Sequence, residues 1–327
     1  MIRFGIIGTN WITERFLDAA KDIEDFTLTA VYSRTEEKAK TFAGKYNATQ
    51  TFTNIEEMVK SDVIDAVYIA SPNSLHAEQA ILCMNHGKHV ICEKPLASNK
   101  KEVESMMQAA QKNDVLLMEA MKSTFIPSFQ VIKENLHKIG PVRRYFATFC
   151  QYSSRYDTYK QGTVLNAFNP AFSNGALMDI GVYCLYPAIT LFGMPKSIKA
   201  IATMLDSGVD GQGSIIMRYD TMEAVLMYSK ITESNLPNEI QGELGSIIIN
   251  KISSPSQVHI AYIDGRKEDL SVPQKENTMY YEIRAFVDLI KAKQTESEIN
   301  TLEQSLKVAS ILDEARAQIG LTFPADF

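Results

Sequence analysis

The sequence predicts an α/β Rossmann domain with a doubly wound parallel sheet, followed by an α+β domain with a large, mostly antiparallel open sheet. Three observations predict this. The first third of the chain alternates short apolar runs with amphipathic stretches, as βαβ units do. Beyond it, strand-like runs follow one another with tight turns and few helices. The chain has 327 residues, more than one core usually serves, so we expect domains at 1–120 and 121–327.

In the first domain, short apolar runs predict strands and helical periodicity predicts the segments between them. The predicted strands are Arg3–Ile7, Leu28–Tyr32, Ala66–Ala70, His89–Cys92 and Val115–Glu119. The predicted helices are Trp11–Lys21, Glu36–Tyr46, Leu75–Asn85 and Lys100–Asn113. A further short helix is expected after Thr53, because Thr53 and Glu56 have the spacing of a capping box.

In the second domain, side-to-side alternation predicts a run of strands. They are Val142–Cys150, Ser197–Leu205, Ser214–Tyr219, Glu223–Ser229, Ser246–Asn250 and Gln257–Tyr262. Asp220-Thr221 and Asp264-Gly265 are typical of hairpin turns. One helix, Gly175–Phe192, interrupts the sheet, and two amphipathic helices, Met279–Ala292 and Leu302–Ile319, end the chain.

Composition and charge narrow the class of protein. The net charge of −6, without any run of Lys and Arg, argues against nucleic acid and anionic membranes as partners. We expect no signal peptide, because Met1 leads almost directly into an apolar strand, and no membrane span, because no apolar run approaches the ~20 residues that cross a bilayer. Four cysteines are scattered without a disulfide framework. We therefore expect a cytoplasmic protein that is not bound to a membrane.

The turn after the first strand has the position of a dinucleotide-binding loop. Its sequence is Gly8-Thr9-Asn10-Trp11-Ile12-Thr13, in which Asn10 and Thr13 replace the second and third glycines of the usual pattern. Asparagine tolerates unusual backbone dihedrals and can cap a helix. We expect the cofactor pyrophosphate to lie against Gly8, Thr9, Asn10, Trp11 and Ile12. The alternative is an ordinary strand-to-helix turn.

The end of the second strand indicates which cofactor binds. An acidic residue there would bind the ribose hydroxyls of NAD, but the sequence has Ser33 and Arg34, with Lys38 one helical turn later. These residues can bind a 2′-phosphate, which an acid would repel. We expect NADP, with NAD possible. The alternative is a solvated basic turn.

Three polar turns follow later strands, at the sheet edge where open α/β sheets bind ligands. They are Ser71-Pro72-Asn73-Ser74-Leu75-His76, Glu93-Lys94-Pro95 and Glu119-Ala120-Met121. We expect ligand contacts from Ser71, Pro72, Asn73, His76, Glu93 and Lys94. The proline after Lys94 favours a fixed turn, whereas a solvated Glu93–Lys94 ion pair is the alternative.

A second candidate cluster lies in the helix predicted over Gly175–Phe192. Asp179 and Tyr183 are four residues apart and share a helix face, and Gly181 leaves room for close approach. A phenol near a lysine ammonium has a lowered pKa and can exchange a proton with an alcohol. On the residues alone, however, a core helix with a satisfied tyrosine is favoured.

Four separated motifs together resemble the Gfo/Idh/MocA oxidoreductase family over nearly the whole chain. They are Phe4-Gly5-Ile6-Ile7-Gly8, Ser71-Pro72-Asn73 with His76, Gly87-Lys88-His89-Val90 followed by Glu93-Lys94-Pro95, and Gly175-Ala176-Leu177 with Asp179-Ile180-Gly181. The resemblance implies a Rossmann domain followed by an open-sheet domain. It also implies that Lys94 contacts substrate and nicotinamide, and that Asn73 and His76 help to hold the cofactor.

Tyr183 occupies a position where the family often has histidine. In this respect the chain resembles the branch of glucose–fructose oxidoreductase, dihydrodiol dehydrogenase and D-xylose dehydrogenase, where a lysine–tyrosine pair is proposed to act, and looks less like the inositol dehydrogenases. Asn10 and Thr13 depart from the family's glycine-rich loop, which leaves the pyrophosphate contacts open.

Cys83, His86, His89 and Cys92 are spaced evenly and could suggest zinc. Gly87 interrupts any helix between them, and His89 and Cys92 point to opposite sides of a strand. We therefore expect no metal site.

The sequence thus predicts an NADP-dependent dehydrogenase for a sugar, polyol or related vicinal diol, acting as a homodimer. Tyr183 is the expected acid/base, Lys94 lowers its pKa and binds the substrate oxygen, and Asp179 orients the site. The loop Tyr152–Asn174 suits a hydroxylated ligand, and the alternative is a surface excursion or a dimer contact. A cofactor-sensing regulator on the same fold is the main alternative, against which the presence of both Lys94 and Tyr183 argues. An NAD-using glycosidase would need a different set of acid/base residues.

Overall fold

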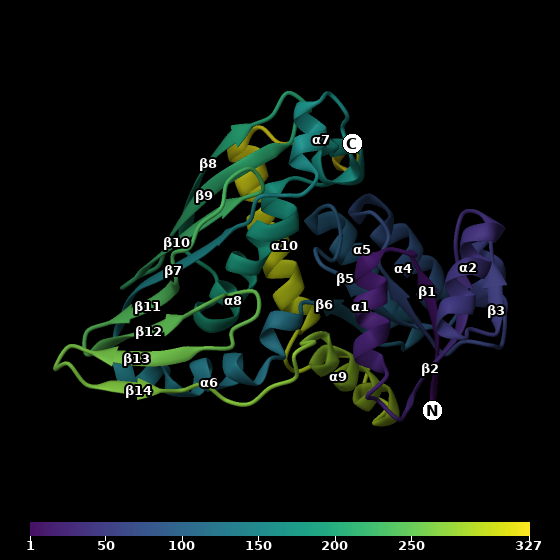
Figure 1. Cartoon of the computed structure of the whole chain (residues 1–327), viewed down its shortest axis with the longest axis horizontal. Helices are drawn as coiled ribbons and strands as arrows, with labels where there is room; N and C mark the ends of the chain where they lie inside the picture. Colours follow the sequence, from purple (N-terminus) through teal and green to yellow (C-terminus); the bar gives the residue numbers. More distant parts are fainter. The chain divides into compact units, whose positions relative to one another are not determined.

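The computed structural model describes all residues, Met1–Phe327. They form two compact units (Figure 1). The first consists of Met1–Ala120 and Lys275–Leu306, and the second of Met121–Gln274 and Lys307–Phe327. A segment that follows the second sheet in sequence therefore belongs to the first unit.

The first unit is built on a six-stranded parallel sheet in the order β3-β2-β1-β4-β5-β6. Its strands are β1 (Ile2–Ile7), β2 (Phe26–Tyr32), β3 (Gln50–Phe52), β4 (Ala66–Ile69), β5 (His89–Glu93) and β6 (Leu117–Ala120). The strand order changes direction between β1 and β4. Open α/β sheets bind ligands at such a switch point, beyond the carboxyl ends of the strands, so this edge is where a cofactor is expected.

The helices of the first unit are α1 (Trp11–Ala20), α2 (Glu36–Tyr46), α3 (Ile55–Lys60), α4 (His76–Asn85), α5 (Lys100–Asn113) and α9 (Met279–Lys291). The helix α9 packs against α1, and the ring of Phe286 lies 5.9 Å from that of Phe4. The capping box predicted at Thr53 is wrong. Asn54 is the N-cap of α3, because its side-chain oxygen accepts the N–H groups of Glu56 and Glu57.

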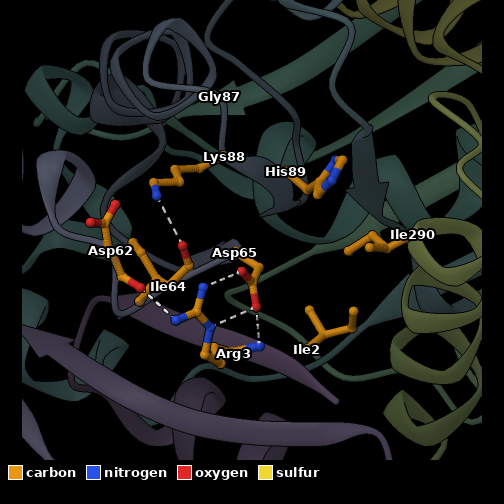
Figure 2. Close-up of a pocket in the computed structure, with 9 residues that line it drawn as sticks. All are labelled: Ile2, Arg3, Asp62, Ile64, Asp65, Gly87, Lys88, His89 and Ile290. Atoms are coloured by element: carbon orange, nitrogen blue, oxygen red, sulfur yellow. Dashed lines mark hydrogen bonds and ion pairs between the residues drawn. The ribbon is translucent and has the colours of Figure 1, made fainter.

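An open cavity of about 600 Å³ lies at the amino ends of β1, β4 and β5, opposite the expected cofactor edge (Figure 2). Two of its charged side chains, Arg3 and Lys88, form hydrogen bonds that connect neighbouring segments of the sheet. The Arg3 guanidinium forms two hydrogen bonds with the Asp65 carboxylate, at 2.6 and 3.0 Å, and Lys88 donates to the carbonyl oxygens of Ser61 and Ile64. These bonds join β1 and the segment before β5 to the segment that leads into β4.

The second unit is built on an eight-stranded sheet in the order β14-β13-β12-β11-β7-β10-β9-β8. Its strands are β7 (Val142–Cys150), β8 (Ser197–Met204), β9 (Asp210–Arg218), β10 (Glu223–Ser229), β11 (Asn238–Gly242), β12 (Gly245–Ile249), β13 (Val258–Tyr262) and β14 (Lys267–Asp269). Only β7 and β10 pair in parallel; the other neighbours are antiparallel. The mostly antiparallel sheet predicted from the sequence is confirmed, although β11 and β14 were not predicted.

One face of this sheet is buried beneath helices, which Figure 1 shows beside β7 to β14. They are α6 (Pro127–Asn135), α8 (Val182–Phe192) and the later part of α10 (Leu302–Ile319). By length and composition the segment Pro170–Phe192 could cross a membrane, although no such run was expected from the sequence; 72% of its most apolar stretch is buried, however. It therefore serves as a core segment here.

Short helical elements occur in both units. The five-residue helix α7 (Tyr156–Lys160) lies in the long loop after β7. A π-helical turn, Leu177–Gly181, leads into α8. Single turns of 3₁₀-helix occur at Asn73–Leu75, Lys122–Thr124, Leu136–Ile139, Asn166–Phe168, Pro170–Phe172 and Pro324–Asp326.

Candidate active site

The turn between β1 and α1 approaches the end of β4 closely. Gly8 has a φ of +108°, and a Cβ at this position would lie 2.5 Å from the carbonyl oxygen of Ala70. The Asn10 amide donates to the same oxygen at 2.7 Å. The absence of a side chain at Gly8 is therefore a requirement of the turn, as in a loop that lies against a pyrophosphate.

Asn10 also caps α1. Its Oδ1 accepts the N–H groups of Ile12 and Thr13 at 3.1 and 3.3 Å. These hydrogen bonds explain why asparagine can replace the second glycine, because the Asn10 side chain stabilises the conformation of the turn. Two amides of the helix start are thus already used, which leaves those of Thr9, Asn10 and Trp11 to a bound pyrophosphate. The residues fit the group, with a ten-residue helix directly behind the turn.

The end of β2 presents positive charge. Ser33 is buried and its N–H donates to Phe52 O at 3.1 Å, which fixes the backbone of the turn. Arg34 and Lys38 are exposed, and neither forms an ion pair in this structure. Thr35 at the start of α2 makes no side-chain cap. Two uncommitted cations and an uncapped helix start fit the 2′-phosphate of NADP.

His76 lies beneath the expected cofactor edge. It is fully buried, with Nδ1 3.0 Å from Pro95 O and Nε2 2.9 Å from Ser71 O. Burial lowers the pKa of its imidazole. A neutral ring has one N–H, so only one of these contacts is a donated hydrogen bond at a time. His76 thus joins the Ser71 turn to the Pro95 turn from below, and Ser71 is held further by a 2.7 Å bond to Gln79.

Glu93 and Lys94 differ in their surroundings. Glu93 is only 8% exposed and accepts a 2.7 Å hydrogen bond from the Tyr68 hydroxyl, whose ring stacks on Phe16 at 3.7 Å. A solvated Glu93–Lys94 ion pair, the alternative interpretation, does not describe this buried carboxylate. Lys94 is half-buried at the carboxyl end of β5, among the turns that surround the expected cofactor edge.

Sequence reasoning gave no role to Glu119, which lies one residue before the end of the wholly buried strand β6. Its Oε1 accepts the N–H of Leu96 at 3.0 Å, and its Oε2 has no partner. Burial raises the pKa of this carboxyl to about 7, opposed by a hydrogen bond with Ser305 and by the charge of Lys94. Glu119 therefore ties the turn after Lys94 to the neighbouring strand. The sequence feature that could have identified Glu119 as a buried carboxylate is its position directly after the apolar run 115–118.

In the second unit, Asp179 lies in the π-helical turn and Tyr183 in the first turn of α8. The helix predicted around Gly175–Phe192 is present, but its first part is π-helical, where the Val182 N–H reaches back to Leu177 O. π-turns within helices are frequent at functional sites. The Tyr183 ring packs edge-on against Phe149, with centroids 5.7 Å apart.

Packing against the sheet explains the two glycines of this segment. A Cβ on Gly181 would lie 3.0 Å from the Tyr228 ring, and one on Gly175 would lie 2.1 Å from Asp210 Oδ1. The space beside Gly181 is thus taken by Tyr228 of β10. Asp210 is fully buried and accepts the Leu177 N–H at 2.7 Å, and burial raises the pKa of its carboxyl to about 6. The turn is therefore held against β9 and β10.

The loop Tyr152–Asn174 folds onto itself. Its tyrosines Tyr156 and Tyr159 stack with centroids 5.9 Å apart, and both rings contact Phe168. The Tyr152 hydroxyl donates to Asp157 at 2.8 Å. These contacts give the loop a fixed shape but do not distinguish a ligand contact from a dimer contact.

No group of three or more His, Cys, Asp or Glu side chains is arranged to hold a metal ion. The residues with the zinc-like spacing have other surroundings. The His86 ring contacts Leu82 O, His89 accepts the Leu116 N–H, and Cys83 and Cys92 are buried.

Comparison with known families covers most of the chain. Residues 2–121 match the Gfo/Idh/MocA oxidoreductase family with an NAD-binding Rossmann fold, and residues 130–248 match the C-terminal domain of the same family. These matches coincide with the parallel sheet and with much of the antiparallel one.

Individual relatives extend over the full length. A scyllo-inositol 2-dehydrogenase (NADP(+)) of Bacillus subtilis is 61% identical, over 100% of this chain and 99% of that protein. A trans-1,2-dihydrobenzene-1,2-diol dehydrogenase of Xenopus tropicalis is 31% identical, over 98% and 99%. A 3-ketoreductase from Actinomadura kijaniata, solved with NADP and TDP-benzene, has a TM-score of 0.86 at 26% identity, over 97% and 98%.

These relatives bear on the substrate expectation drawn from Tyr183. The diol dehydrogenase agrees with the branch that this tyrosine indicates. However, the same argument set the chain apart from inositol dehydrogenases, and the relative at 61% identity is named as one.

The buried Glu119 predicts a pH dependence of stability. The pKa of its carboxyl is raised from 4.5 to about 7 in the folded protein, so the folded state binds the proton more tightly than the unfolded chain. The contribution of Glu119 therefore favours folding below about pH 4.5 and is lost as the pH rises through about 7. Glu119→Gln keeps the acceptor for Leu96 N–H without a charge.

We expect the free energy of unfolding of the wild type to fall relative to that of Glu119→Gln between about pH 5 and 8, by up to about 3 kcal/mol. Denaturant titrations across this range measure the difference. An exposed carboxylate, Glu104→Gln in α5, is the control and should leave the pH dependence unchanged. Parallel curves for the wild type and Glu119→Gln would contradict the assignment.

Proposed function

This chain belongs to the Gfo/Idh/MocA family and is an NAD(P)-dependent oxidoreductase, and we propose that it interconverts a cyclic polyol and its ketone, with scyllo-inositol as the first candidate and NADP as the cofactor. The observation that carries this proposal is the full-length similarity to the NADP-dependent scyllo-inositol enzyme. Other polyols, sugars and vicinal diols remain within the proposed class. The proposed location is the cytoplasm.

The chain's own residues supply binding and proton transfer. The cofactor, when bound, accepts or supplies the hydride at C4 of its nicotinamide. In the oxidation direction, Tyr183 takes the hydroxyl proton as the C–H bond breaks and a C=O bond forms. Lys94 binds the reacting oxygen and stabilises the Tyr183 phenolate by its charge. Asp179 orients the substrate beside Tyr183.

The cofactor is held, in this proposal, by the first unit. Gly8, the amides of Thr9, Asn10 and Trp11, and the helix start at Ile12 form the pyrophosphate turn. Ser33, Arg34 and Lys38 bind the 2′-phosphate. The polar turns complete the nicotinamide end, through Ser71, Pro72, Asn73, His76, Glu93 and Lys94. The domain of residues 121–327 would bind substrate and form the oligomer.

A substrate screen tests the proposal. Purified protein is incubated with NADP⁺ and, separately, scyllo-inositol, myo-inositol, common sugars and trans-dihydrodiols, and NADPH formation is followed by absorbance. We expect the highest kcat/KM with a cyclic polyol. A protein that binds NADPH yet oxidises none of these hydroxyl compounds would support the cofactor-sensing alternative instead.

The positive charge after β2 predicts a preference between cofactors. Arg34→Ala removes a charge-assisted hydrogen bond worth about 1.5–3 kcal/mol, so NADPH binding should weaken by roughly 10–100-fold. NADH binding should change little, because it has no 2′-phosphate. Lys40→Ala is a matched control, since Lys40 lies on the same helix but pairs with Glu36. Titrations of intrinsic fluorescence measure both cofactors; equal or tighter NADH binding by the wild type would contradict the preference.

The proposed acid/base pair predicts loss of chemistry without loss of folding. Tyr183→Phe should lower kcat by about 10²–10⁴-fold, the usual value of general acid–base catalysis, with melting temperature and NADPH affinity near wild type. Lys94→Ala should lose at least as much, and the basic limb of its pH profile should move upward. Tyr262→Phe, which removes a phenol from β13, is the control. Full turnover by Tyr183→Phe would place the proton transfer elsewhere.

The outer face of the eight-stranded sheet predicts a homodimer. Ile201, Ile216 and Met227 share this face and are 72%, 50% and 36% exposed. Water contact with such an apolar face is unfavourable, and a second copy would cover it. Light scattering should give twice the monomer mass at micromolar concentration, and Ile216→Glu should lower it. Ile263→Glu, at the exposed turn after β13, is the control. A monomeric wild type would refute this part of the proposal.

A further inference from the structure

Lys230, directly after β10, is a buried cation that sequence reasoning did not single out. Its side chain is 4% exposed, and its ammonium lies 2.8 Å from Asp179 Oδ2. It also donates to Ala167 O at 2.8 Å and to Asn174 Oδ1 at 3.4 Å. The face of the Phe168 ring lies below it, with the centroid 5.0 Å away.

The three donors of the ammonium are matched by three acceptors. These acceptors come from different segments: the turn at 166–168, the end of the loop after β7, and the π-helical turn. Lys230 therefore fixes the position of Asp179 relative to both the loop and the sheet. At 4% exposure it is too enclosed to bind a substrate itself.

Asp179 is the exposed member of this pair. Its side chain is 35% exposed, and Oδ2 is the oxygen that meets Lys230. The backbone below it has little freedom, because Asp210 accepts the Leu177 N–H and Gly181 packs on Tyr228. Lys230 thus holds one oxygen of the carboxylate, and the sheet holds the backbone beneath it.

We propose that Lys230 is a positioning residue of the active site, which holds the Asp179 carboxylate in the direction needed to orient the substrate. The inference rests on the role proposed above for Asp179. Lys230 acts through that carboxylate and through the loop that ends at Asn174. Asp179 lies in the π-helical turn that leads directly into α8 and Tyr183, so a fixed carboxylate keeps the substrate hydroxyl aligned with the proton acceptor.

Lys230→Met tests this by removing the charge while keeping the length of the side chain. Misplacement of a positioning group by about 1 Å can cost on the order of 100-fold, so we expect a fall of that size in kcat/KM. The affinity for NADPH should not change, because the cofactor is assigned to the first unit. Lys196→Met, which breaks an exposed pair with Asp220 in the same unit, is the control and should retain full activity.

Two readouts separate positioning from a general structural role. In an Asp179→Asn background, Lys230→Met should add less than about threefold, because residues acting as one unit are not additive. The charged group nearest the pair on β9 is Asp210, whose carboxyl feels the charge of Lys230, and the Tyr228 hydroxyl of β10 lies near Asp210 in turn. With aspartate labelled at the carboxyl carbon and Asp179→Asn used for assignment, the NMR titration of Asp179 should move to higher pH in Lys230→Met, since its counter-charge is gone.

Each possible result either supports or overturns the proposal. Wild-type kcat/KM and an unmoved Asp179 titration in Lys230→Met would overturn the proposal, as would a loss that adds in full to that of Asp179→Asn. If Lys230→Met does not fold, the Lys230→Met/Asp179→Asn double variant decides: restored folding supports a paired unit, and continued unfolding assigns Lys230 to the loop and overturns the proposal. If the wild type oxidises no polyol, the proposed function fails, while the NMR titration still reads the Lys230–Asp179 coupling.

Discussion

The close contact between Gly8 and Ala70 is the constraint on which the candidate cofactor edge depends. Since no Cβ fits between them, the β1–α1 turn can lie directly on the end of β4. Hydrogen bonds then connect each turn at this edge of the sheet to the next. Asn10 bonds to Ala70 O, His76 contacts both Ser71 O and Pro95 O, and the Leu96 N–H reaches Glu119. The carboxyl ends of β1, β4, β5 and β6 are thus held as one surface.

Both units place a buried charge behind their candidate catalytic side chains. In the first, the Glu119 carboxylate holds the turn that follows Lys94. In the second, the Lys230 ammonium meets Asp179, one helical turn before Tyr183. Burying a charge is costly unless it is paired or hydrogen-bonded. That cost is offset in function, because a buried and paired charge allows its neighbours few other positions, and an active site needs its side chains in fixed positions.

The sequence predicts those parts of the structure that depend on neighbouring residues, and it does not predict those that depend on contacts between distant residues. The buried strands β1, β4 and β5 are continuous apolar runs, so their positions could be read directly, and Asn10 was correctly expected as a helix cap. Local patterns could not show that α9 packs in the first unit, since an amphipathic helix does not specify its partner. The short strands β11 and β14 are polar and are defined by their neighbours.

The candidate site was predicted in part for the same reason. Motif positions identified Lys94, Asp179 and Tyr183, and their catalytic roles remain proposals. The π-turn arises where Gly181 meets Tyr228, and the roles of Glu119 and Lys230 arise from burial, so all three depend on residues distant in sequence. A lysine after a strand, such as Lys230, is most often a solvated residue. Nothing in its local sequence distinguishes it from one.

Isotope transfer tests the central claim of direct hydride exchange between a polyol and NADP. scyllo-Inositol carrying deuterium on its ring carbons is incubated with the wild-type protein and NADP⁺, and the isolated cofactor is analysed by mass spectrometry and NMR. The account predicts one deuterium per reduced cofactor, located at C4 of the nicotinamide. Reduced cofactor without deuterium, or no reduction with any polyol under conditions in which NADPH binds, would contradict it.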